Sequence, residues 1–252
     1  MRNPLAPALI AACLVVSPVP AGAEELGKMI EAERDTFNEA VRSYLLTHPE
    51  VMIEVMNELQ ASEEREAATR DLEMLAANSD AIFHDANDWS GGNPDGDITV
   101  VELMDYRCPY CYQAYKAVDE LVETDGNIRF VLKEFPVLGD KSVLASKFAI
   151  SVLQIEGSDA YKAIHDALFE MKGEVDEATL RKLVTDKGYD ADAIFKTMES
   201  DEVQKVIDAN YALAQTLEIN GTPTFIINNA MVRGYVPLDG MRKIVGTQRD
   251  RQ

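Results

Sequence analysis

Two cysteines three residues apart, Cys108 and Cys111, are the residues of this chain best suited to chemistry. They lie in a Cys-Pro-Tyr-Cys motif that follows an apolar run at 98–104 and precedes a helix-favouring stretch at 112–124. The third cysteine, Cys13, lies in an N-terminal segment that we expect to be removed. Two thiols at a strand-to-helix junction, with no other cysteine in the mature chain, indicate the making and breaking of disulfides.

The position of each cysteine on the expected helix predicts its role. Cys108 should be the N-cap, with Pro109 in the first helical position, where a missing N–H is tolerated. Free N–H groups of the first turn, the helix dipole and Arg107 then stabilise a thiolate, so the pKa of Cys108 should lie well below the ordinary value of about 8.5. Cys111, one turn further on, should be more buried and remain a thiol. We therefore expect Cys108 to attack and Cys111 to resolve.

A carboxyl, Glu102, lies six residues before the first cysteine. Strand alternation places it on one face with Met104 and Tyr106, beneath the motif. A buried carboxyl there can take the proton of Cys111 when that thiol resolves a mixed disulfide. A second and compatible interpretation is an ion pair between Glu102 and Lys133 on the neighbouring strand.

The segment Gly221-Thr222-Pro223-Thr224 opens an apolar strand, where proline is tolerated only at an end or an edge. If the Thr222–Pro223 peptide is cis, the Thr222 backbone lies exposed beside the sulfurs and can pair with an extended substrate chain. Most Thr-Pro pairs are trans, so the pair alone is weak evidence. The evidence from Thr222–Pro223 is stronger here because the pair follows a strand–CxxC–helix unit in the chain.

The elements that position these residues follow a strand–helix–strand order. Residues 98–104 and 128–135 are expected strands, and the helix between them should end at Asp125 with Gly126 in the C′ position. Such a βαβ unit predicts a parallel pair with a right-handed crossover.

The rest of the chain is expected to be helical up to a final strand pair. Residues 140–218 carry helical patterns with good N-cap residues at Ser158, Asp176, Asp190 and Ser200. A strand at 222–229 should pair with 231–235 across an Asn-Ala turn, before a closing helix at 238–245. The predicted fold class is therefore α/β, a sandwich with a helical block inserted between strands.

Residues 24–75 are expected to form a separate helical region, interrupted at residues 47–50. Its apolar residues recur at helical spacing and need a partner surface. Periodicity alone leaves a hairpin docked on its own domain and an oligomerisation stalk equally open. The recurring residues are Phe37, Val41, Tyr44, Leu45, Val51, Met52, Val55, Met56 and Leu59. Residues 76–97, rich in turn formers, are expected to be a linker that Trp89 pins to a surface.

Residues 1–23 have the pattern of a secretory signal, with Arg2, an apolar core and the cleavage site Ala21-Gly22-Ala23. The apolar core is too short to span a bilayer. A lipoprotein cleavage site ending at Cys13 is a weaker alternative. Export would place the thiol pair in a compartment where disulfides persist.

Composition narrows the possible partners. The net charge of −20 becomes −21 when the segment with Arg2 is removed, so nucleic acid and anionic membranes would repel the chain. The remaining residues suffice for one sizeable domain with an appendage. With no spare cysteine, the mature chain has no structural disulfide.

Several segments together resemble the DsbA family, a thioredoxin fold with a helical insertion, over residues 93–252. The N-terminal residues 35–59 resemble the corresponding region of ScsC-like proteins. The segments that carry the likeness to the Com1/ScsC type are Asn93–Asp97, Asp105–Cys111, Lys133–Pro136 and Tyr44–Glu50.

This resemblance implies that Cys108 is the nucleophile, that Cys111 resolves, that Pro223 is cis and that Thr222 lies beside the site. It favours the stalk over the docked hairpin, because such N-terminal regions trimerise in some relatives. The Pro-Tyr dipeptide departs from the pairs usual in the best-known oxidases and isomerases and occurs in glutaredoxins. The redox poise therefore stays open.

Metal binding is the main competing hypothesis. Two cysteines with the scattered His48, His84 and His165 do not supply the four ligands of a zinc site. Copper(I) is the serious alternative, because two thiolates suit it and the chain has ten methionines, which otherwise fill cores. Relatives of the ScsC type are also tied to copper tolerance. We expect no cofactor or resident metal beyond the redox-active disulfide Cys108–Cys111.

The sequence and the resemblance together predict an exported, periplasmic thiol–disulfide oxidoreductase. Its partners would be unfolded or mis-oxidised client proteins, a membrane redox partner that resets the disulfide, and further copies of the chain. Oxidase and isomerase use the same residues, and an oligomer with several sites around a client favours isomerase or reductase over oxidase by a small margin.

Overall fold

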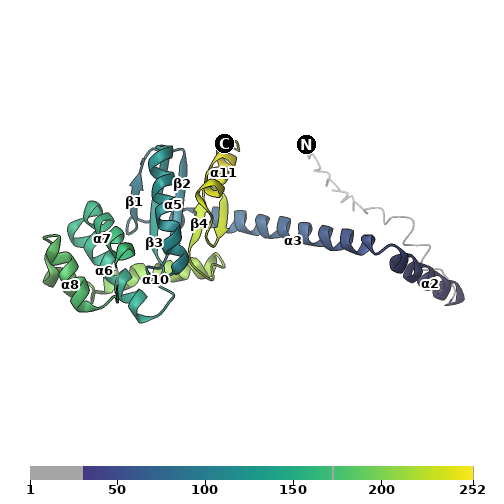
Figure 1. The fold of residues 1–252 in the computed structure, drawn as a ribbon, viewed down its shortest axis with the longest axis horizontal. Coiled ribbons are helices and arrows are strands. Elements are labelled where there is room, and N and C mark those ends of the chain that lie inside the picture. Colours follow the sequence, from purple (N-terminus) through teal and green to yellow (C-terminus); the bar gives the residue numbers. More distant parts are fainter. Residues whose placement is uncertain (1–30, 172, 252) are drawn as a thin grey trace, which may run out of the picture. The chain divides into compact units, whose positions relative to one another are not determined.

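The computed structural model describes residues 31–171 and 173–251. The expected signal segment, with Arg2, Cys13 and the Ala21–Ala23 cleavage site, lies outside the described residues. The chain divides into two compact units, Met1–Glu64 and Arg65–Gln252. Figure 1 gives the order of the elements along the chain.

The described part of the first unit is helical. Helix α2 (Glu31–Thr47) ends where the break was predicted, and α3 (Glu50–Ala77) begins after Pro49 and continues into the second unit. The His48 N–H still bonds the Tyr44 carbonyl at 2.8 Å, which closes the last turn of α2. Large apolar side chains of both helices are 40–70% exposed, so the described residues of this unit form no core that buries them. They are Phe37, Val41, Tyr44, Leu46, Met52, Ile53, Val55, Met56 and Leu59.

The second unit is built around one mixed sheet of five strands in the order β1-β3-β2-β4-β5. The central strands β2 and β3 run parallel, as the βαβ pattern predicted, and β4 runs antiparallel to β2. This is the arrangement that the thioredoxin-fold resemblance implied. The strands are β1 (Trp89–Gly92), β2 (Ile98–Met104), β3 (Ile128–Glu134), β4 (Thr224–Ile227) and β5 (Ala230–Arg233).

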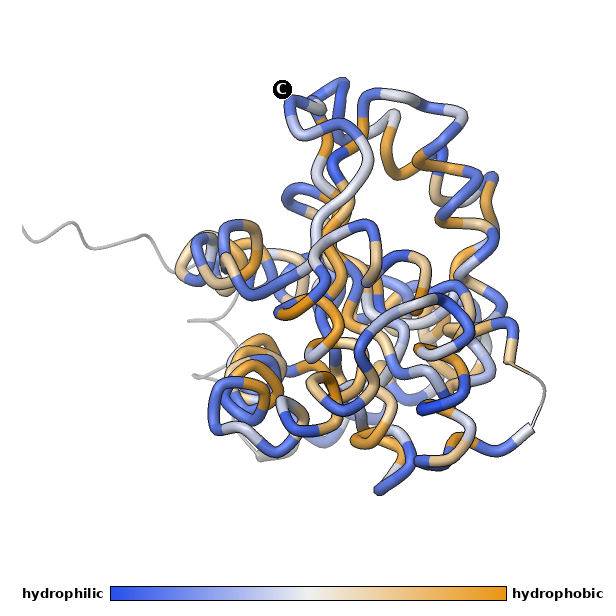
Figure 2. The backbone as a smooth tube through the Cα atoms, turned by 90° about the vertical axis from the view of Figure 1, so that its left-hand side faces the viewer, coloured by the Kyte–Doolittle hydropathy of each residue, from blue (hydrophilic) through white to orange (hydrophobic). Residues whose placement is uncertain are grey.

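Helices cover both faces of this sheet. The larger core packs α5, α6, α7 and α11 against one face, and a smaller core packs the end of α3, α4 and α10 against the other. Figure 1 shows α6, α7 and α8 gathered as one block, and Figure 2 shows hydrophobic and hydrophilic residues alternating along the helices of this unit. The helices are α4 (Ser79–Phe83), α5 (Pro109–Asp125), α6 (Asp140–Glu156), α7 (Ser158–Glu170), α8 (Glu177–Asp186), α9 (Ala191–Thr197), α10 (Asp201–Thr216) and α11 (Leu238–Arg249).

The helix boundaries follow local sequence signals closely. Asp176, Asp190 and Ser200 are N-caps as predicted, and each side chain accepts the N–H of the residue three positions on. Ser158 is instead the first residue of α7, because Gly157 occupies the N-cap. No helix in the described ranges is both long and apolar enough to cross a membrane.

The segment expected as a linker, 76–97, differs from that expectation. It contains α4 and the edge strand β1, which pairs antiparallel with β3. Trp89 is 7% exposed, stacks on Tyr161 at 5.7 Å between ring centroids and donates its Nε1–H to the Ser158 carbonyl at 3.0 Å. Burial of one large aromatic ring offsets the many turn-forming residues around it, so a short strand forms there.

The last hairpin is shifted slightly from the predicted one. Strand β5 begins at Ala230, so the turn consists of Asn228 and Asn229 rather than an Asn-Ala pair. Asn228 has φ +48°, a left-handed conformation that asparagine tolerates better than most residues. Its side-chain oxygen accepts the Thr99 N–H at 2.8 Å, which ties the turn to β2.

Candidate active site

The cysteine motif lies where the sequence predicted. Cys108 is the N-cap of α5 with extended dihedrals, φ −76° and ψ 119°, and Pro109 takes the first helical position. The helix ends at Asp125, and Gly126 adopts a left-handed φ of +71° that closes it. Cys111 has no exposed surface and Cys108 is 6% exposed, so the order of burial is the predicted one.

Both sulfurs lie next to the strand opening at Thr222. The Cys108 Sγ donates to the Thr222 carbonyl at 3.2 Å, and the Thr222–Pro223 peptide is cis. No first-turn N–H of α5 bonds this sulfur, because the thiol points to the carbonyl instead. Burial raises the pKa of the Cys111 thiol strongly, and the negative charge of Glu102 adds to this, while hydrogen bonds with the Asp105 backbone and the Thr222 side chain act in the opposite direction.

Glu102 lies on the sheet face that carries α5, as strand alternation predicted. It is 4% exposed, and its carboxyl makes no hydrogen bond or ion pair with any described residue. Burial, and then the negative charge of Asp119 on α5, raise its pKa to about 8. A carboxyl with a pKa close to neutral can take up and return a proton at physiological pH.

The interpretation of Glu102 as the partner of Lys133 is wrong. In the parallel register Glu102 is opposite Leu132, whereas Lys133 is opposite Leu103, so the two side chains point to different faces of the sheet. Lys133 is fully buried and forms an ion pair with Asp88, from the segment before β1. Burial raises the pKa of Asp88 to about 6, although Lys133 acts against this.

Asp105 is a residue that the sequence reasoning did not single out. It is fully buried just before the motif, and its carboxylate accepts the N–H groups of Arg107 at 2.7 Å, Val137 at 2.8 Å and Leu138 at 3.0 Å. Its carbonyl also accepts the N–H of Cys108 at 3.0 Å. One side chain thus fixes the loop before the nucleophile against the loop that follows β3.

A second buried carboxyl, Glu134 at the end of β3, was also missed. Its Oε1 accepts the hydroxyls of Tyr106 at 2.9 Å and Tyr161 at 2.6 Å, and its Oε2 accepts Ser146 at 2.7 Å. Burial raises the pKa of Glu134 to about 7 although these hydrogen bonds lower it. His165 lies against Tyr106, and burial lowers its pKa to about 3, so the ring is neutral.

Two models of known protein families match this chain, and one of them covers the site described above. A family model described as a DSBA-like thioredoxin domain matches residues 99–246. The chain belongs to this DSBA-like thioredoxin family. A second model, described as the copper resistance protein ScsC N-terminal domain, matches residues 33–66. The DSBA-like match includes both cysteines, Glu102 and the Thr222–Pro223 peptide.

The chain is also similar to several solved structures and curated proteins. A thioredoxin-like oxidoreductase from Silicibacter pomeroyi DSS-3 is 38% identical, covers 68% of this chain and 97% of its own, and has a TM-score of 0.64. A linker-deletion mutant of Proteus mirabilis ScsC is 25% identical, covers 89% of this chain and 99% of its own, and also has a TM-score of 0.64. The Na(+)/H(+) antiporter NhaA 1 of Salinispora arenicola is 29% identical over 61% of this chain. The match spans only 24% of that antiporter.

Proposed function

We propose that this chain is an exported, periplasmic thiol–disulfide oxidoreductase that exchanges disulfides in client proteins. One observation carries the proposal: two thiols of unequal burial both lie next to Thr222, Cys108 against its carbonyl and Cys111 near its side chain. On the same sheet face as Cys111 lies the Glu102 carboxyl, which has no hydrogen-bond partner among the described residues. The family membership and the Silicibacter pomeroyi relative support the same class of chemistry.

The exchange proceeds by two displacements. The Cys108 thiolate attacks one sulfur of a client disulfide, and the other client sulfur leaves as a thiolate. Glu102 then takes the proton of Cys111, and the Cys111 thiolate attacks the Cys108 Sγ. The mixed disulfide breaks, the client leaves as a dithiol and the Cys108–Cys111 disulfide holds the two-electron oxidation. The reverse sequence oxidises a client, and Glu102 returns the proton.

Isomerisation uses only the first half of this sequence. A second thiolate of the client attacks the mixed disulfide, Cys108 leaves as a thiolate, and the protein is unchanged. We favour isomerisation or reduction over oxidation because we also propose that the chain is an oligomer, which would hold several sites around one client. An oligomer would also hinder docking to a membrane partner that regenerates an oxidase.

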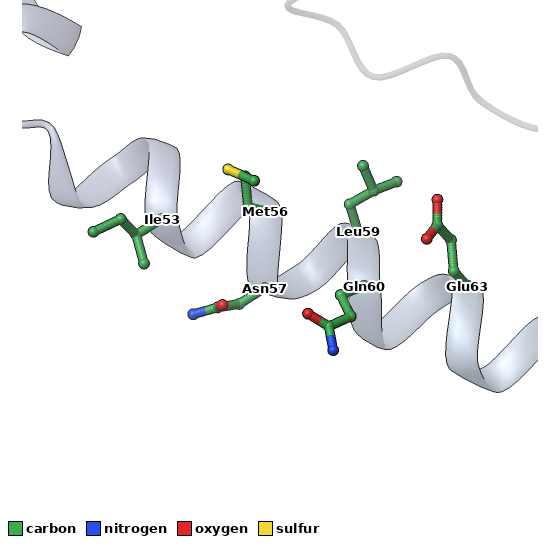
Figure 3. A pocket seen from close by; sticks show the side chains of 6 residues that line it. All are labelled: Ile53, Met56, Asn57, Leu59, Gln60 and Glu63. Atoms are coloured by element: carbon green, nitrogen blue, oxygen red, sulfur yellow. The ribbon is translucent and has the colours of Figure 1, made fainter. Parts of the chain in front are cut away.

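The basis for the oligomer is the exposed apolar surface of the first unit. Ile53, Met56 and Leu59 are 58–67% exposed on successive turns of α3. Together with the polar Asn57, Gln60 and Glu63 they line an open hollow, and Figure 3 shows all six side chains projecting from this one helix. Exposed apolar patches of this kind mark association surfaces, and we propose that further copies of the chain occupy this one, with a trimer as the expected assembly.

The experiment compares two assays on the full mature chain: rescue of a client with scrambled disulfides and oxidation of a reduced client. Cys108→Ser should abolish both, because the attacking sulfur is lost. Ile53→Glu with Leu59→Glu should produce monomers in light scattering, lower rescue and raise oxidation. Thr69→Glu, which adds a charge at an exposed polar position of the same helix outside this hollow, is the control. Equal rescue by monomer and oligomer would contradict the isomerase proposal, and activity in Cys108→Ser would contradict the whole scheme.

Copper(I) binding is a second candidate, favoured by the description of the family model that matches residues 33–66. The thiolates of Cys108 and Cys111 would be its soft ligands. Copper(I) titration of the reduced protein separates the two candidates. Tight stoichiometric binding without exchange activity would favour the copper function, and exchange without binding would exclude it.

A further inference from the structure

A hollow with a volume of 270 Å³ adjoins the cysteine motif on the side of the helical insertion. Two of its lining residues, Arg107 and Tyr112, are the residues directly before and directly after the motif, so the hollow adjoins both ends of the motif. Its lining residues include Arg107, Tyr112, Lys141, Phe169 and Glu174.

The charged residues of this hollow are mostly cationic. The Arg107 guanidinium makes no hydrogen bond or ion pair with any described residue. Lys141 is paired with Glu174 at 2.5 Å, but the two side chains are 40% and 78% exposed. Because exposed ion pairs contribute little, Lys141 can exchange this partner for a ligand carboxylate at small cost. In a chain with a net charge of −20, such a local excess of positive charge next to the nucleophile selects for anions.

The size and the walls of the hollow narrow the class of ligand. Its volume is just below the lower end of the range for small-molecule sites, which suits one half of a small disulfide rather than a folded client. Tyr112 and Phe169 supply aromatic walls for a short aliphatic or peptide-like body. Arg107 presents a planar fork of donors that matches a carboxylate.

We propose that this hollow is a subsite for the carboxylate of a small thiol compound, so that the enzyme exchanges disulfides with anionic low-molecular-weight disulfides faster than with neutral ones. This inference rests on the proposed function, and it adds a substrate class to the same site. Arg107 and Lys141 bind the carboxylate, and Tyr112 and Phe169 enclose the body of the molecule.

The chemistry is that of the client reaction with a smaller partner. The Cys108 thiolate attacks one sulfur of the small disulfide, a bond forms between them, and the other half leaves as a thiolate. Cys111, with its proton taken by Glu102, then attacks the Cys108 Sγ and releases the second half. The small disulfide gains two electrons and the cysteine pair loses two.

The test compares three small disulfides as oxidants of the reduced protein. Glutathione disulfide carries carboxylates, bis(2-hydroxyethyl) disulfide is neutral, and cystamine is cationic. The rate with the neutral compound reports exchange itself, and therefore the proposed function. The ratio of the glutathione rate to the neutral rate reports only the subsite. Rates come from acid quenching, alkylation and mass spectrometry of the Cys108–Cys111 pair.

Substitutions of the lining residues should change the ratio of the glutathione rate to the neutral rate in defined directions. Arg107→Gln should lower the ratio about fivefold, because a charge-assisted hydrogen bond is lost. Lys141→Gln should lower it about twofold, since Glu174 already engages this cation. Glu174→Gln should raise it about twofold, because Lys141 is released to the ligand. Lys243→Gln, an equal charge change on the exposed surface of α11, is the matched control and should leave the ratio unchanged.

A binding measurement without chemistry completes the test. S-methylglutathione cannot exchange, and it should shift the NMR signals of Tyr112 and Phe169 in the wild-type protein and much less in Arg107→Gln. The proposal is overturned if the ratio is unchanged in Arg107→Gln, if Lys243→Gln lowers it equally, or if Glu174→Gln lowers it too. Discrimination seen with acidic peptide clients but not with glutathione disulfide would likewise overturn it.

Discussion

Two buried carboxyls lie on neighbouring strands of the same sheet, and their surroundings differ. Glu102 and Glu134 are 4% and 3% exposed. No described residue donates a hydrogen bond to the Glu102 carboxyl, whereas three hydroxyl groups donate to Glu134. Burial raises the pKa of both, to about 8 and about 7 respectively.

The difference shows how one fold can use the same residue type in two ways. A buried carboxyl without partners is free to gain and lose a proton, which suits proton transfer to and from Cys111. A buried carboxyl with three donors joins the elements that supply them, here the motif loop, α6 and α7. We infer that Glu102 serves the chemistry and that Glu134 holds the helical insertion against the site.

The largest effect should come from removing the acceptor at Glu134. Glu134→Leu leaves the hydroxyls of Tyr106, Tyr161 and Ser146 buried without their acceptor, so the free energy of unfolding should fall by about 3 kcal/mol or more. Glu134→Gln keeps one acceptor oxygen and should cost about half as much. Denaturant unfolding measures both. A Leu variant as stable as the wild type would contradict the structural role proposed for Glu134.

The pH dependence of stability should reveal both carboxyls. Each holds its proton in the folded chain at pH values where the unfolded chain has already lost it, so stability falls as pH rises from about 5 towards 8. Between pH 5 and 7 the contribution of Glu102 amounts to about 2 kcal/mol. Glu102→Gln should flatten this slope. An unchanged slope in that variant would mean that Glu102 has its ordinary pKa in the folded chain.

The kinetic effect of Glu102→Gln should fall on one step. Loss of the proton acceptor should slow the attack of Cys111 on the mixed disulfide about tenfold to a hundredfold, within the usual range for general base catalysis. The first attack by Cys108 should change little, because Glu102 acts on the other sulfur. Single-turnover measurements that trap the mixed disulfide separate the steps. Equal slowing of both steps would indicate a general disturbance of the site.

The sequence predicted those features that depend on local chemistry. The N-cap position of Cys108, the left-handed Gly126 and the break before Pro49 follow from residues within a few positions of each other. Strand alternation also placed Glu102 on the correct face. The DsbA resemblance added the cis state of the Thr222–Pro223 peptide, which no local pattern determines.

The features that the sequence did not predict depend on residues far apart in the chain. The donors to Glu134 come from 12, 27 and 28 positions away, and Lys133 bonds Asp88 across 45 positions. The ion pair expected between Glu102 and Lys133 failed because a difference of one residue in register reverses the face of a strand side chain. The signal in the sequence was the pair of charged residues Lys133 and Glu134 directly after the apolar residues 130–132 of β3.

The smallest effect offers a test within one helix. Ser146 and Ser142 both lie on α6 with no exposed surface, but only Ser146 has a partner, and the Ser142 Oγ lacks any among the described residues. Ser146→Ala removes one buried hydrogen bond to the Glu134 carboxyl and should cost about 1.5 kcal/mol. Ser142→Ala removes an unsatisfied hydroxyl and should be neutral or slightly stabilising. Equal losses in the two variants, measured by denaturant unfolding, would show that packing at α6 rather than the hydrogen bond to Glu134 sets the stability of this region.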